Sequence, residues 1–279
     1  MDKLKLAGIL VTLLIASGCS MPNQGNNNSS GGNKGPQLTQ NRGLRVINFR
    51  STDETLRPSQ PAIINLRLKN YHEADINITD LYLYNEGLLT VENRSCNPSP
   101  EDLKPASGNN YPEMHCQWDL KAPSKDKYGF PSSKPTSVNL HLEYESALTN
   151  QKPFKVQYKH LDEINSTSNI GKTFKNSEVR MAVSTENPVP LESRRVLHVR
   201  THEVGKGRIA SDTDYKFRFS PKTLFDGCAR SDAPTVNKEL KFKCKLTPPS
   251  HSGTRNLLFS THYKYVKEPV LRMKLVNNQ

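Results

Sequence analysis

The 279-residue sequence predicts an all-β protein made of two tandem antiparallel β-sandwiches, which follow an N-terminal signal peptide and a disordered tether. Three observations support this fold class. Apolar and polar residues alternate with a period of two in many short segments, and no long segment has a helical stripe. Nineteen prolines and 15 glycines separate these segments. A set of landmarks also recurs in the same order in the two halves of the chain.

The N-terminus has the pattern of an export signal. Lys3 and Lys5 precede an apolar run over residues 6–15, and small residues lead to Cys19. A run of about ten apolar residues is too short to span a bilayer of roughly 30 Å. Small residues before a cysteine resemble the lipobox of prokaryotic lipoproteins, although Ala16 stands where that motif usually has Leu. The resemblance implies a lipoprotein signal peptide over 1–19 that ends at a lipidated Cys19, which anchors the protein to the membrane; an ordinary secretory cleavage region is the alternative.

Residues 20–41 are mainly Asn, Gly, Ser, Gln and Pro. This composition offers too little apolar surface to offset the entropy of ordering, so it predicts a disordered tether.

The internal duplication sets the predicted domains. The alternating strand 63–70 corresponds to 195–201, and the β-forming segment 138–144 corresponds to 257–265. Each of the latter leads to a further strand, at 154–158 in the first copy and 270–275 in the second. Short strands in units of roughly 110 residues are typical of immunoglobulin-like sandwiches. We expect a first sandwich at 42–160, a linker at 161–177 and a second sandwich at 178–279.

Four cysteines remain after Cys19 is assigned to lipid, and they allow three disulfide connectivities. The local pairs Cys96–Cys116 and Cys228–Cys244 are favoured because each couple falls at the same place in its own repeat, and disulfides fit an oxidising compartment. Zinc is the competing interpretation, but the cysteines have no close Cys-x-x-Cys spacing and no grouped histidine.

At this level the chain resembles prokaryotic, especially archaeal, surface proteins built from tandem immunoglobulin-like modules of the cell-adhesion-related (CARDB-like) kind. The residues that carry the resemblance are 66–70, 116–123 and 138–144, with their second-copy counterparts. The cysteine couples depart from antibody domains, where the bridged residues lie far apart on opposing sheets. The resemblance implies an architecture and a place on the cell surface.

Positive charge is concentrated in the second half. The net charge of +12 divides into +2 for residues 1–41, +1 for 42–160 and +9 for 161–279. On alternating strands, Lys241, Lys243 and Lys245 share one face, and Lys216 and Arg218 alternate with aromatic residues in the same way. We expect a cationic stripe that contacts an acidic glycan, an envelope polymer or a surface protein; a solvated outer face is the alternative. No aromatic platform or helix is placed to read bases, which argues against sequence-specific nucleic-acid binding.

The sequence predicts no catalytic residue, metal or cofactor. His198 and His202 would share a strand face and could begin a metal site, but exposed strand histidines explain them equally well. Residues 124–127 match a Ser-x-x-Lys string, although it lies between Pro123 and Gly129, where the helix that this chemistry needs cannot easily form. Possible glycosylation sequons begin at Asn27, Asn28, Asn77, Asn93 and Asn165.

The leading hypothesis is therefore a non-enzymatic, lipid-anchored, extracytoplasmic surface protein that acts in adhesion, scaffolding or binding. The alternative is an envelope enzyme or accessory subunit whose site lies between the two domains, around His198 and His202.

Overall fold

The computed structural model describes residues 43–73, 76–129, 132–150, 152–210, 216–231 and 239–277, which all belong to one compact unit. Cys19, the segments 1–19 and 20–41, and the sequons at Asn27 and Asn28 lie outside the described residues. No helix in the described part of the chain is long and apolar enough to cross a membrane.

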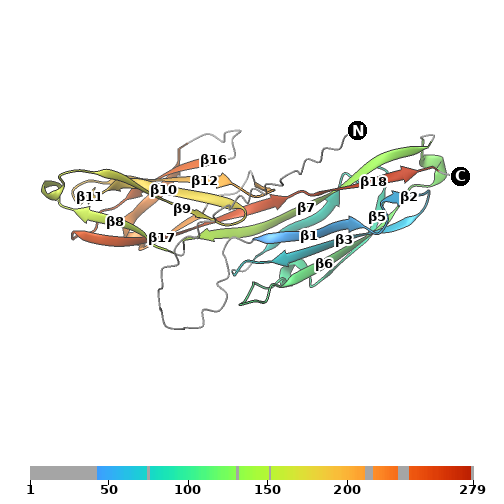
Figure 1. Ribbon diagram of the computed structural model, residues 1–279, viewed down its shortest axis with the longest axis horizontal. Coiled ribbons are helices and arrows are strands. Elements are labelled where there is room, and N and C mark those ends of the chain that lie inside the picture. Colours follow the sequence, from blue (N-terminus) through green and yellow to red (C-terminus); the bar gives the residue numbers. More distant parts are fainter. Residues whose placement is uncertain are drawn as a thin grey trace, which may run out of the picture. The chain divides into compact units, whose positions relative to one another are not determined.

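The described residues form eighteen strands and four short 3-10 helices (Figure 1). In chain order they are β1 (Leu44–Ser51), β2 (Thr55–Leu56), β3 (Pro61–Asn70), β4 (Ile78–Tyr84), β5 (Thr90–Asn97), η1 (Pro100–Asp102), β6 (Glu113–Lys121), η2 (Lys125–Lys127), β7 (Ser133–Thr149), β8 (Phe154–Lys159), η3 (Leu161–Glu163), β9 (Ser168–Lys175), β10 (Val179–Asn187), β11 (Val189–Pro190), β12 (Arg195–Glu203), β13 (Arg208–Ile209), β14 (Lys216–Ser220), η4 (Lys222–Leu224), β15 (Phe225–Arg230), β16 (Glu239–Leu246), β17 (Gly253–Lys267) and β18 (Val270–Val276). The strand pairs are antiparallel except β8 with β11 and β2 with β18. The all-β, antiparallel class is confirmed.

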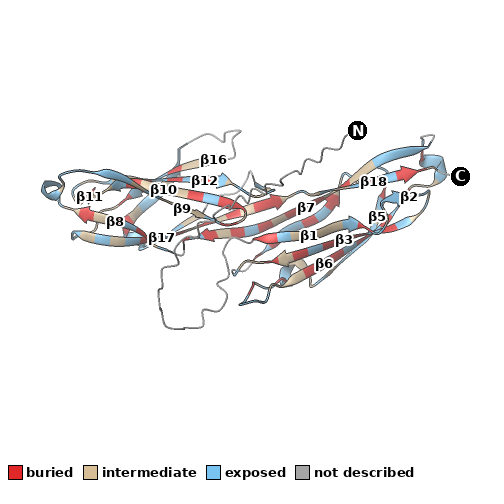
Figure 2. Ribbon diagram, in the orientation of Figure 1, coloured by how far each residue is buried: buried red, intermediate tan, exposed pale blue. Residues whose placement is uncertain are grey.

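Burial follows the period-two pattern of the sequence. In β3, for example, Ala62, Ile64, Leu66 and Leu68 are buried while the residues between them are exposed or half-buried. Figure 2 shows the same alternation of buried and solvent-facing residues along β7, β10 and β17. Alternation places every second side chain in the core because successive side chains of a strand point to opposite faces of the sheet.

Two of the sheets have equivalent strand orders, as the duplication predicts. One sheet runs β1-β3-β6-β5, and the other runs β9-β10-β12-β16-β15. The strands β10, β12, β16 and β15 correspond to β1, β3, β6 and β5, and β9 is an additional edge strand. The registers correspond as well, since Leu66 lies opposite Cys116 in the first sheet and Leu197 lies opposite Cys244 in the second. The sequence repeat is therefore a repeat of structure.

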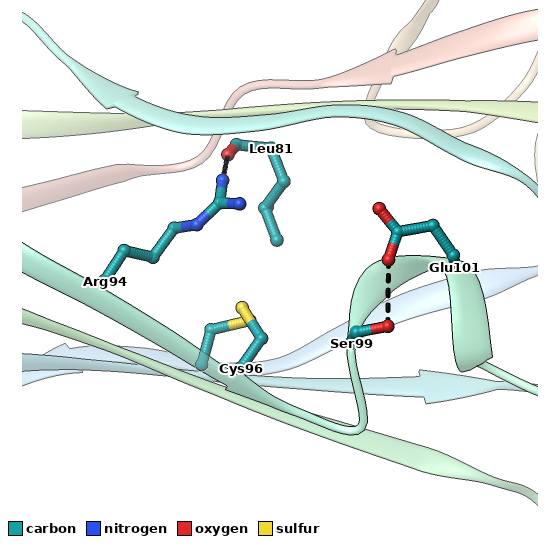
Figure 3. The surroundings of a disulfide bond; sticks show 6 residues. Leu81, Arg94, Cys96, Ser99 and Glu101 are labelled. Atoms are coloured by element: carbon teal, nitrogen blue, oxygen red, sulfur yellow. Dashed lines mark hydrogen bonds between the residues drawn. A yellow bond between two sulfur atoms is a disulfide. The ribbon is translucent and has the colours of Figure 1, made fainter.

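Both predicted disulfides are present and occupy equivalent places. Cys96–Cys116 joins β5 to β6, and Cys228–Cys244 joins β15 to β16. Near the first disulfide, the guanidinium of Arg94 on β5 donates a hydrogen bond to the carbonyl oxygen of Leu81 on β4 (Figure 3). This bond connects the β1-β3-β6-β5 sheet to a strand of the other large sheet.

The third sheet shows that the two repeats exchange their last strands. β7 pairs with β18 along 133–139 and with β4 along 139–144, and β17 pairs with β8 along 253–257 and with β14 along 258–262. In the chain, however, β8 follows β7 and β18 follows β17. Each repeat thus contributes its last strand to the long strand of the other repeat. The two long strands also pair directly, with 142–149 of β7 opposite 260–267 of β17.

Strand pairing therefore crosses the expected boundaries at 160 and 178. β18 belongs by sequence to the predicted second sandwich but pairs with β7 of the first. β8 belongs to the predicted first sandwich but pairs with β17 of the second. The segment 161–177, expected to be a linker, contains β9, which pairs along its whole length with β10. The strand β9 was not predicted because most of its residues are polar. Its Ile170 and Phe174 are half-buried, and the ring of Phe174 packs edge-on against that of Phe259 with 5.2 Å between the ring centres.

Candidate functional site

The outer face of the β9-β10-β12-β16-β15 sheet gathers positive side chains from four strands. We call this surface the basic face and define it by six residues. They are Lys175 on β9, Arg180 on β10, Arg200 on β12, and Lys241, Lys243 and Lys245 on β16. Five of the six are exposed, and Lys241 is half-buried. Their neighbours along each strand point into the core, as the buried Phe242, Cys244 and Leu246 show.

The strand registers place several of these cations next to one another. Arg180 lies directly opposite Lys175, and Arg200 lies directly opposite Lys241. Like charges at directly opposite positions of an antiparallel pair destabilise the sheet. A bound anion would remove that repulsion, so the arrangement suits the binding of negative charge better than it suits the stability of the free protein.

Carboxylates occur only around the basic face in the described residues of this sheet. Glu239 lies opposite His202 at one end of β16, and Glu186 forms an ion pair with Arg195 at 3.0 Å. Asp226 on β15 pairs with Arg194 at 2.9 Å. The middle of the face thus keeps a strong excess of positive charge.

The structure brings together only part of the predicted stripe. Lys241, Lys243 and Lys245 share the basic face, but Lys216 and Arg218 lie on β14, which belongs to a different sheet and pairs with β17. Arg218 lines a separate depression of about 810 Å³ with Phe217, Phe219 and Phe225. Both β14 and β16 have the expected alternation of apolar and polar residues. The prediction of one stripe failed for Lys216 and Arg218 because alternation does not determine which sheet a strand joins.

His198 and His202 do share one face, and both are exposed within the basic face. His198 lies opposite Lys243. Among the described residues, no group of three or more His, Cys, Asp or Glu side chains could hold a metal ion. The described sequon residues Asn77, Asn93 and Asn165 are exposed, and Asn93 lies on β5 with its amide 3.4 Å from the carboxylate of Asp119.

The buried carboxylate of Glu178 lies at one end of the β9-β10-β12-β16-β15 sheet, next to the basic face. Glu178 lies in the turn between β9 and β10, two residues before Arg180, and is fully buried. Its Oε1 accepts a hydrogen bond from the Tyr144 hydroxyl at 2.7 Å, and its Oε2 accepts from Ser146 at 2.7 Å and Tyr263 at 3.0 Å. Nε2 of His72 lies 3.5 Å from Oε1. The donors come from β7, β17 and the loop after β3.

These contacts decide the charge of Glu178. Burial alone raises the pKa of a carboxyl group, but the hydrogen bond and charge of His72, the charge of Lys267 and the hydrogen bond from Tyr144 together lower the Glu178 pKa to about 2. Burial and the nearby carboxylate hold the pKa values of Tyr144 and Tyr263 well above their usual range. The cluster is therefore an ionised Glu178 held by neutral tyrosine donors.

Asn176 completes the turn. Its side-chain oxygen accepts hydrogen bonds from the backbone N–H groups of Glu178 and Val179, at 2.9 and 2.8 Å, and its amide donates to the Tyr263 hydroxyl at 2.7 Å. Because Lys175 and Arg180 flank this turn, the buried cluster sets the position of one edge of the basic face.

Sequence reasoning missed Lys175, Arg180, Arg200 and Glu178. The alternation in Arg180–Met181–Ala182–Val183 and in Val199–Arg200–Thr201 carried a signal for Arg180 and Arg200. No local signal identified Glu178, because a charged residue beside a polar turn is usually exposed.

No protein-family model and no curated protein matches the chain. Among solved structures, the crystal structure of a collagen adhesin (CNA) from S. aureus is similar over 83% of this chain and 92% of that chain, with 8% sequence identity and a TM-score of 0.19. Values this low carry no argument about function.

Proposed function

We propose that this chain is a non-enzymatic surface protein, anchored through lipid on Cys19, whose basic face binds a polyanionic partner of the cell envelope. The observation that carries the proposal is the cross-strand placement of like charges, Arg180 opposite Lys175 and Arg200 opposite Lys241. Acidic glycans and charged envelope polymers present repeated negative charges, which match an array of cations on a flat sheet better than a single pocket does.

Two further observations support an extracytoplasmic location. Both cysteine pairs form disulfides, which persist in oxidising compartments. The N-terminal sequence has a basic start, a short apolar run and small residues before Cys19. Export and lipidation would place the basic face where envelope polymers are accessible.

The test is binding to dextran sulfate, with uncharged dextran as the control polymer. We expect the protein to bind dextran sulfate at low ionic strength and to release it as salt is raised through about 0.15 M, where the Debye length is about 8 Å. The variant K241S/K243S/K245S removes three charges from the basic face. A matched control, K121S/K125S/K127S, removes three charges from the first repeat, where all three lysines are exposed.

The proposal requires the basic-face variant to lose most of its binding while the control variant keeps it. Equal loss in both variants would show that net charge alone drives association. Binding that does not depend on salt would also contradict the proposal.

A further inference from the structure

A cavity separate from the basic face collects three cations from distant parts of the sequence. The cavity has a volume of about 710 Å³. Arg45 reaches it from β1, Lys267 from the end of β17 and Lys206 from the loop between β12 and β13. Val204 and Pro269 add apolar surface. The volume is in the range of pockets that hold small organic ligands.

Side-chain contacts fix the positions of two of these cations, Lys267 and Arg45. The ammonium of Lys267 donates a hydrogen bond to the carbonyl oxygen of Leu44 and lies 5.7 Å and 5.9 Å from the ring centres of Tyr144 and Tyr265. The guanidinium of Arg45 lies 5.4 Å from the ring centre of Tyr71. These are aromatic contacts, which orient a cation without neutralising it.

The loop that carries Lys206 is held on both sides. The backbone N–H groups of Val204 and Gly205 donate to the carbonyl oxygen of Glu178, at 2.8 and 3.2 Å. The N–H of Gly207 donates to the Tyr265 hydroxyl at 3.0 Å. At Gly205 a Cβ atom would lie 2.4 Å from that hydroxyl, so the loop approaches as closely as glycine allows. The backbone of this loop is therefore fixed, and the exposed side chain of Lys206 lines the cavity from it.

The charge of the cavity is positive. Among the described residues, no carboxylate lies within ion-pair distance of Arg45, Lys206 or Lys267. Glu268 is the acidic residue that lines the cavity, and it is already engaged by His141 at 3.2 Å and Arg208 at 3.4 Å. The charge of Lys267 also acts on the buried Glu178, so Arg45 and Lys206 supply the uncompensated positive charge of the cavity. Three cationic donors around one space with a net positive charge are complementary to a compact anion.

We infer that this cavity binds a small organic phosphate or sulfate ester, with the anionic group between Arg45, Lys206 and Lys267. The volume exceeds what the anionic group alone needs, and Val204 and Pro269 would contact the carbon skeleton of the ligand. A phosphate monoester carries about −1.5 to −2 charge at pH 7 and three acceptor oxygens, which fit three cationic donors. This site is independent of the polymer-binding role of the basic face.

The test is calorimetric titration of the full chain, in a buffer without phosphate, with glucose 6-phosphate, glucose 6-sulfate and glucose. We expect one or both esters to bind and glucose not to bind; the comparison of the two esters identifies the preferred anion. K206S and R45S should each weaken ester binding by about tenfold or more, the usual effect of losing one charge-assisted hydrogen bond. K243S on the basic face is the matched control.

Thermal melting of each variant checks that folding is intact, and two independent cationic variants keep the test valid if one is destabilised. Failure of both esters to bind, binding of glucose as tight as that of the esters, or an equal effect of K243S would overturn the inference. Because dextran sulfate binding depends on a different set of lysines, failure here leaves the test of the basic face unaffected.

Discussion

The buried carboxylate of Glu178 gives a stability prediction whose size follows from its surroundings. The substitution E178Q keeps the shape of the side chain and removes its charge. In the native protein that charge accepts hydrogen bonds from Tyr144, Ser146 and Tyr263. Burial alone would raise the pKa of Glu178, but the hydrogen bond and charge of His72, the charge of Lys267 and the hydrogen bond from Tyr144 lower this pKa from an ordinary 4.5 to about 2.

The sign of the pH dependence follows from the direction of this pKa change. Because the folded pKa lies below the unfolded one, the ionised carboxylate stabilises the fold above about pH 4.5, and this contribution disappears as the pH falls toward 2. The difference between 4.5 and about 2 corresponds to about 3 kcal/mol at pH 7 and to roughly half of that at pH 3. E178Q should therefore lower the free energy of unfolding more at pH 7 than at pH 3.

Urea denaturation at the two pH values measures this difference. The matched control is E113Q, because Glu113 also pairs with two cations, Arg67 at 2.6 Å and Lys69 at 2.9 Å, but keeps 20% of its side chain exposed. Surface pairs of this kind contribute up to about 1 kcal/mol. If E178Q loses the same free energy at both pH values, or no more than E113Q loses, the assignment of an ionised, stabilising Glu178 is refuted.

Three other substitutions test the packing of the fold. C228A/C244A removes a disulfide that closes a 16-residue separation and should lower the free energy of unfolding by about 3 kcal/mol in urea denaturation; unchanged stability would show that the bridge does not constrain the unfolded chain. W118A should cost about 3–5 kcal/mol in the same assay, because Trp118 is 2% exposed, and a cost below about 1 kcal/mol would contradict its place in the core. G205A should cost about 1–3 kcal/mol because its Cβ would lie 2.4 Å from the Tyr265 hydroxyl, and a wild-type melting temperature would mean that the loop can move aside.

The fold class could be predicted from the sequence because the alternation of apolar and polar residues within each strand indicates which face of that strand is buried. The alternation of Leu240–Leu246 predicts both the inward Phe242 and Cys244 and the outward Lys241, Lys243 and Lys245, and burial agrees. The equivalent positions of the cysteine couples in the two repeats also predicted both disulfides.

The pairing of the last strands was not accessible from the sequence. β8 and β18 have similar lengths and the same alternation, so either could pair with β7 or with β17 on local grounds. The choice between them depends on non-local contacts, in particular on the direct pairing of β7 with β17. A repeat in sequence therefore predicts equivalent sheets, but it does not determine which copy supplies each strand.

The candidate site was predictable to the extent that it lies on one strand. Lys241, Lys243 and Lys245 needed only the alternation of β16, whereas Arg180 and Arg200 needed the cross-strand register, which the sequence alone does not determine. Arg218 has the same local pattern and lies on another sheet. The cavity cations Arg45, Lys206 and Lys267 are far apart in the sequence and meet only in the folded chain.

The exchange of last strands between the repeats is the central claim, since together with the pairing of β7 and β17 it joins the two repeats in one sheet. It is tested most directly by crosslinking S137C/R272C with a short bis-maleimide, which adds one cysteine thiol to each of its two maleimide groups, because Ser137 on β7 lies opposite Arg272 on β18. Peptide mass spectrometry should find these two cysteines joined within one chain, and should find no link in S137C/Q157C, whose second cysteine lies on β8 opposite Thr254 of β17. A link in S137C/Q157C together with none in S137C/R272C would show that each repeat keeps its own last strand and would contradict the account.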